Sequence, residues 1–123
     1  MNMQAQRAYE TSASFRGLRA QEADIFRRVN GGLRSALQAG PIQRVRALAD
    51  NRRLWQTVSD LLRDPANGLP RELRAGLVSI GVTVQREMDA ERPDIEFLIA
   101  VNENIAAGLG EGSVQEVKQC VQS

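Results

Sequence analysis

Apolar residues recur along the chain at helical spacings of three and four positions, and no stretch alternates apolar and polar residues as a strand would. Breaks rich in proline and glycine separate the helical stretches. The pattern therefore predicts an all-α fold, a compact bundle of four main helices with a short helix before it. The main helices are predicted over Leu18–Ala39, Pro41–Arg63, Pro70–Ala90 and Pro93–Leu109, and the short one over Met3–Ser12. We expect residues 1–109 to form a single helical domain and residues 110–123 to form a flexible polar tail.

Two of these helices carry patterns that predict how they pack. The helix over Pro41–Arg63 has one apolar side and one charged side, so it is expected at the surface of the bundle. The helix over Pro70–Ala90 carries no charge from Ala75 to Gln85 and is apolar nearly all round. Because such helices are usually buried, we expect it to be the central helix.

The helix over Leu18–Ala39 is interrupted by Asn30-Gly31-Gly32, and two interpretations fit. The helix could break there, or it could be continuous and thinned by the glycines so that a neighbour comes close. The apolar stripe resumes in phase beyond the glycines, which favours a continuous helix. This stripe comprises Leu18, Ile25, Val29, Gly32 and Ala36, widened by Phe26, Leu33 and Leu37.

Two asparagines and the single tryptophan fall on apolar stripes. Asn51 and Asn102 could each bond nearby groups and fix how the helices align, bond each other across the core, or meet a partner's helix. Trp55 is either a core residue or an interface anchor, since tryptophan is common in both places.

Composition argues against catalysis. The chain has no histidine and one cysteine, which excludes a Ser-His-Asp triad, a His-containing zinc site and an internal disulfide. We expect no enzyme activity, no metal and no cofactor, and we expect the carboxylate pairs Asp60/Asp64 and Asp89/Glu91 to be solvated. A net charge of +1 and only 4% aromatic residues argue against nucleic-acid binding. Lacking an apolar signal or membrane-length segment, the chain is expected to stay in the cytoplasm.

Three blocks, taken in order, resemble the FlaF family, small flagellar-biosynthesis proteins of alphaproteobacteria. The resemblance covers about residues 5–109. The blocks are Asn51-Arg52-Arg53-Leu54-Trp55, Asn67-Gly68-Leu69-Pro70-Arg71-Glu72-Leu73-Arg74-Ala75 and Leu98-Ile99-x-x-Asn102-x-x-Ile105-x-x-Gly108-Leu109.

The resemblance implies a role with flagellin. Members of this family support flagellin secretion and oppose FlbT, a regulator that acts on flagellin messenger RNA. It implies a flagellin-binding export chaperone that regulates filament assembly; control of flagellin synthesis through FlbT or the message is the alternative. The same apolar surface would also suit self-association. Partner contacts are expected where the most specific blocks gather, although the loop residues among them would equally shape the loop and start the helix. The candidates are Arg52, Trp55, Asn67, Leu69, Pro70 and Leu73.

Overall fold

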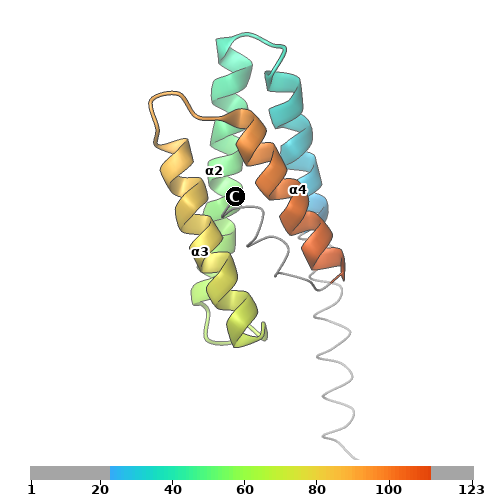
Figure 1. Ribbon diagram of the computed structural model, residues 1–123, viewed down its shortest axis with the longest axis vertical. Helices are drawn as coiled ribbons and strands as arrows, with labels where there is room; N and C mark the ends of the chain where they lie inside the picture. The colour runs from blue at the N-terminus through green and yellow to red at the C-terminus, as the bar shows by residue number, and fades with distance from the viewer. Residues whose placement is uncertain (1–22, 112–123) are drawn as a thin grey trace, which may run out of the picture.

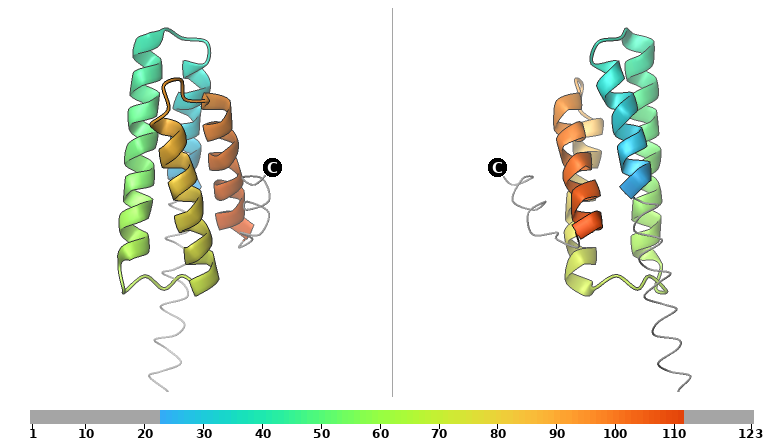
Figure 2. Two further views of the ribbon diagram at one scale, coloured as in Figure 1. Left: turned by 60° about the vertical axis from the view of Figure 1, so that its left-hand side comes forward. Right: turned by 90° about the vertical axis from the view of Figure 1, so that its right-hand side faces the viewer.

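The computed structural model describes residues 23–111 and confirms the all-α fold. Its helices span residues 23–36, Pro41–Arg63 (α2), Arg71–Met88 (α3) and Ile95–Glu111 (α4). They run up and down as a four-helix bundle in which each helix lies beside the next along the chain, and α4 closes the ring against the helix over residues 23–36 (Figures 1 and 2). An ion pair between Arg34 and Glu103 joins those two helices. The expected helix at Met3–Ser12 and the tail from residue 112 lie outside the described residues.

Proline and aspartate lie at the starts of three helices. Pro41 occupies the first turn of α2, where its missing N–H is not needed, and the predicted bounds of this helix are confirmed. Pro70 is the N-cap residue of α3, so this helix begins at Arg71, one residue later than predicted. Asp94 caps α4, because its Oδ1 accepts the Phe97 N–H at 3.1 Å. The α4 helix ends two residues beyond the predicted Leu109.

Side chains from every helix fill the centre of the bundle. The α2 helix contributes Ala47, Leu54, Trp55 and Leu62, at 4% to 6% exposure. The apolar side chains at 0% to 2% exposure come from the other three helices and are Phe26, Leu33, Ala36, Ile80, Val84, Leu98, Val101 and Ile105. None of the helices in residues 23–111 is both long enough and apolar enough to span a membrane.

The expectation that residues 70–90 form a central buried helix is wrong. Leu73, Leu77 and Ile80 of α3 do face the core, but Val78 and Val82 are 49% and 48% exposed. In a ring of four helices every helix keeps an outward face (Figure 2). A face without charges therefore need not be a buried face.

The first described helix is continuous through Gly31 and Gly32, but close packing is not the reason. Both glycines are exposed, and a Cβ built on either meets nothing within 4 Å in the described structure. The buried stripe is also rotated from the predicted one, because Ile25 is 43% exposed while Asn30 is buried. The side chains that face the core are Ala23, Phe26, Asn30, Leu33 and Ala36.

Candidate functional site

Three asparagines meet in the centre of the bundle. Asn102 of α4 donates from Nδ2 to Asn51 Oδ1 at 2.7 Å and to Asn30 Oδ1 at 3.0 Å. Its Oδ1 accepts the Trp55 Nε1–H at 3.0 Å. The three amides are at most 2% exposed, so they do not meet a partner's helix. We call Asn30, Asn51, Asn102, Trp55 and Met88 the asparagine network.

The outer members of the asparagine network are satisfied as well. Asn51 donates from Nδ2 to the Met88 sulfur at 3.2 Å, and Asn30 donates to the Ile99 carbonyl oxygen at 3.0 Å. A buried amide without partners would destabilise the fold, so these contacts explain how a dry core holds three asparagines. Sequence reasoning missed Asn30, which it took as part of an interruption. Its spacing four after Phe26 and three before Leu33 is the signal that could have placed it in the core.

Trp55 lies in the core, 4% exposed, and connects the asparagine network to the apolar packing. Its ring meets Phe26 edge-on, with centroids 5.6 Å apart and an interplanar angle of 80°. Two carbons of its six-membered ring, Cε3 and Cζ3, lie 3.6 and 3.7 Å from the point where a Cβ on Gly81 of α3 would stand. Trp55 therefore supports the wall between the core and the outer surface of α2 and α3.

A groove runs along the outside of the bundle between α2 and α3, with a volume of about 410 Å³. We call it the α2–α3 groove. Trp55 reaches its floor, and the half-exposed Val78 and Val82 form its α3 wall. The polar side chains on its rim are mostly uncharged, and the charged ones, Asp60 and Arg63, both belong to α2. The groove thus combines an apolar floor and α3 wall with a polar rim of Gln56, Ser59, Asp60, Arg63 and Gln85.

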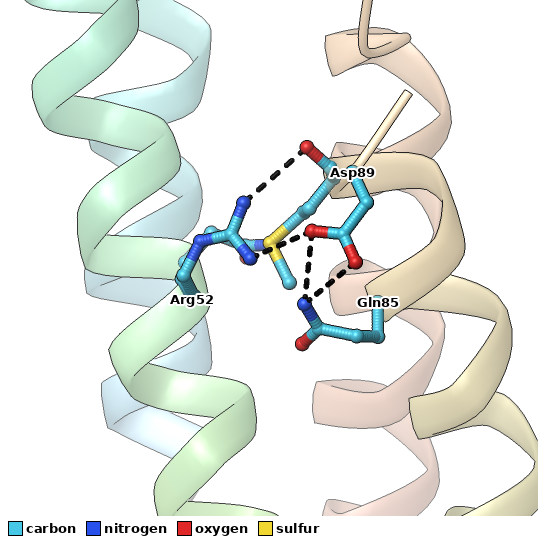
Figure 3. Close-up of polar contacts among 5 residues, drawn as sticks. Arg52, Gln85 and Asp89 are labelled. Carbon is cyan, nitrogen blue, oxygen red and sulfur yellow. Dashed lines mark hydrogen bonds and ion pairs between the residues drawn. The ribbon is translucent and has the colours of Figure 1, made fainter. Parts of the chain in front are cut away.

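Arg52 ties α2 to the end of α3 beside this groove (Figure 3). Its Nη1 donates to Asp89 Oδ1 at 2.9 Å, and its Nη2 donates to the Met88 carbonyl oxygen at 3.3 Å. Gln85, which lines the groove, donates to both carboxylate oxygens of Asp89 at 3.2 and 3.3 Å. The hydrogen bond from Arg52, followed by that from Gln85, lowers the pKa of Asp89 below its ordinary value.

The loop between α2 and α3 is organised by Asn67. Its Nδ2 donates to the Leu61 carbonyl oxygen at 2.6 Å, and its Oδ1 accepts the Leu69 N–H at 2.9 Å. The Asn67 carbonyl oxygen in turn accepts a hydrogen bond from Arg74 Nη2 at 2.7 Å. These bonds close the end of α2 onto the start of α3, which is a structural task for this loop.

The six candidate partner residues therefore fall in separate places. Trp55 is buried beneath the α2–α3 groove, and Arg52 lies beside it in the contact with Asp89. Asn67, partly buried Leu69 and exposed Pro70 belong to the loop, and Leu73 points into the core. The apolar groove surface comes instead from Val78 and Val82, which the family resemblance does not single out.

The described residues offer little for acid–base or metal chemistry. No Asp or Glu between residues 23 and 108 is buried, and the pairs Asp60/Asp64 and Asp89/Glu91 are all exposed. Within the described part of the chain, no three metal-ligating side chains gather closely enough to hold an ion. What the arrangement can do is present an apolar groove on a rigid support.

Comparison with protein families matches residues 5–109 to the family described as "Flagellar protein FlaF". Comparisons with curated proteins and with solved structures give no significant match.

Proposed function

This chain belongs to the FlaF family of flagellar proteins, and we propose that it is a non-catalytic cytoplasmic chaperone that binds flagellin before export and regulates filament assembly. The observation that carries the proposal is the α2–α3 groove, where the half-exposed Val78 and Val82 lie beside the buried Trp55. A groove of this kind accepts the apolar face of an amphipathic helix, with anchors spaced three and four residues apart.

The affinity expected of the groove also suits a chaperone. Two half-exposed valines provide a modest apolar area, and Gln56, Ser59 and Gln85 provide polar rim groups. Modest area supports binding that covers an aggregation-prone helix and still releases it, since affinity depends on a few well-packed anchors. Membership of the FlaF family supports flagellin, with an apolar helical terminus, as the proposed ligand.

The test is calorimetric titration with monomeric flagellin from the same organism. Wild-type protein should bind saturably with a negative heat-capacity change, and flagellin lacking its C-terminal helical segment should not bind. The pair Val78→Ser and Val82→Ser should weaken binding, because it removes the apolar wall of the groove.

A matched control comes from the other end of α2. Ile42 and Val45 are 67% and 68% exposed and do not line the groove, so their replacement by serine should leave flagellin affinity unchanged. Equal loss in both double variants would show a general effect of surface hydrophobicity and contradict a groove site. Absence of binding by the wild type would remove the chaperone proposal.

Control of flagellin synthesis through FlbT or the flagellin message is the alternative role. The exposed charged residues of α2 are Arg44, Arg46, Arg52, Arg53 and Arg63 with Asp50 and Asp60 among them, and Arg52 is paired with Asp89, so the acids and this ion pair dilute a basic patch for RNA. If flagellin does not bind, titration with FlbT and with flagellin message at two salt concentrations would test this role, since RNA contacts weaken steeply with salt.

A further inference from the structure

Gly81 occupies the middle of α3 without a packing reason inside the bundle. A Cβ added there would lie 3.6 and 3.7 Å from two carbons of the Trp55 ring, which is ordinary van der Waals contact. Alanine would therefore fit, and alanine is the better helix former. The packing of the bundle does not explain the glycine.

The position of Gly81 in the α2–α3 groove explains the glycine instead. Gly81 lines the α2–α3 groove and shares one face of α3 with Val78, Val82 and Gln85, at helical spacings of three and four. The missing side chain leaves a low point in the floor, over the Trp55 ring and beside the wall formed by the two exposed valines. Glycine is used where another backbone must approach closely.

We propose that Gly81 is a specificity-determining residue of the groove, which selects a partner helix carrying a small residue in its apolar stripe at the point where it crosses α3. This inference rests on the proposed function and names the class of helix that the site takes. Packed helices lie roughly 8–10 Å apart, depending on the side chains at the contact. Glycine on one helix gives the closest approach only if the facing residue is also small.

The occupant is a single partner helix rather than a second copy of this chain. Stable homodimers bury about 2,000 Å² or more, much of it apolar. The other exposed large hydrophobic residues of the described chain lie outside the groove and do not extend it into such a surface. They are Ile25, Leu37, Ile42 and Val45.

Charge also restricts the occupant. The α3 wall is uncharged from Ala75 to Gln85, while Asp60 and Arg63 lie together on α2. A helix seated here must turn an uncharged, apolar stripe toward α3, because a charge buried against that wall would have no partner. Charged residues on the same helix are accommodated only on the side facing α2.

The experiment compares Gly81→Ala with Gly31→Ala, using monomeric flagellin as the probe. Gly31 also lies inside a helix, is exposed, and has nothing within 4 Å of a built Cβ among the described residues. Both variants should therefore raise Tm by about 4 °C, from helix propensity alone. Only Gly81→Ala should weaken flagellin binding, by about tenfold or more, because the added methyl overpacks the crossing point.

Four results would overturn the proposal. Flagellin affinity of Gly81→Ala equal to that of Gly31→Ala would show that the groove needs no close approach there. A lowered Tm for Gly81→Ala would show that the bundle itself requires the glycine. If the valine-to-serine pair weakens binding and Gly81→Ala does not, the chaperone function stands and this inference alone fails. A wild type that binds no flagellin removes both.

Discussion

Replacing Asn102 by leucine should destabilise the bundle far more than the same change at Asn51, although both side chains are at most 1% exposed. Asn102→Leu leaves three buried groups without these hydrogen-bond partners: the Trp55 Nε1–H and the Oδ1 atoms of Asn30 and Asn51. Each such group costs about 1–3 kcal/mol, or about 3–9 kcal/mol together. Burying leucine instead of an amide offsets about 1.5–3 kcal/mol, which leaves a net loss of about 4 kcal/mol at the middle of the two ranges.

Asn51→Leu is the matched comparison. It removes the acceptor of only one N–H of Asn102, whose amide still donates to Asn30. It also removes the hydrogen bond to the Met88 sulfur, which is a weak acceptor. One unpaired group at about 1–3 kcal/mol is nearly offset by the apolar gain. The free energy of unfolding should therefore change by no more than about 1–2 kcal/mol.

Urea unfolding followed by Trp55 fluorescence measures both variants, with equal m-values as the check that the free energies are comparable. A loss in Asn102→Leu at least about 2 kcal/mol larger than in Asn51→Leu is expected. Equal losses, or a stabilised Asn102→Leu, would refute the assignment of Asn102 as the centre of the asparagine network.

Three smaller perturbations test other contacts. The folded-state pKa of Asp89 lies below its ordinary value of 3.8, so its stabilising effect is present above that pH and is lost as pH falls through the lowered pKa. Arg52→Gln should raise the Asp89 pKa toward 3.8 in an NMR titration, and an unchanged pKa would contradict the Arg52 hydrogen bond as its main cause. Asn67→Ala should lower the free energy of unfolding by about 1–2 kcal/mol through loss of two loop hydrogen bonds; undiminished stability in urea would argue against a structural role. Asp94→Ala should cost about 1 kcal/mol in the same assay because α4 loses its cap, and a change near zero would show that the cap is replaced by water.

The positions of the helices could be predicted from sequence because their boundaries are local. Pro41 starts α2, and the breaks around residues 64–70 and 92–93 separate the later helices, as expected. Proline restricts its own backbone and that of its neighbour, whatever the rest of the chain does.

Burial was harder to predict because it depends on distant partners. Asn30 looks like a surface residue until Asn102 and the Ile99 carbonyl are placed beside it, 72 and 69 positions away. Val78 and Val82 look like core residues because residues 75–85 of their helix lack charge, yet no helix covers them in the described structure. The groove was missed for the same reason, since it exists only where α2 and α3 lie side by side.

The asparagine network has a consequence for the kinetics of folding. Its hydrogen bonds join residues 37 to 72 positions apart, and its members come from all four described helices. A chain with one helix undocked leaves buried amides unpaired, so partly assembled bundles gain nothing from the network and unfolding should be a single cooperative transition. Because its long-range contacts form only after the helices have docked, the network should lower the unfolding rate rather than raise the folding rate. Its polar bonds therefore lengthen the lifetime of the folded bundle.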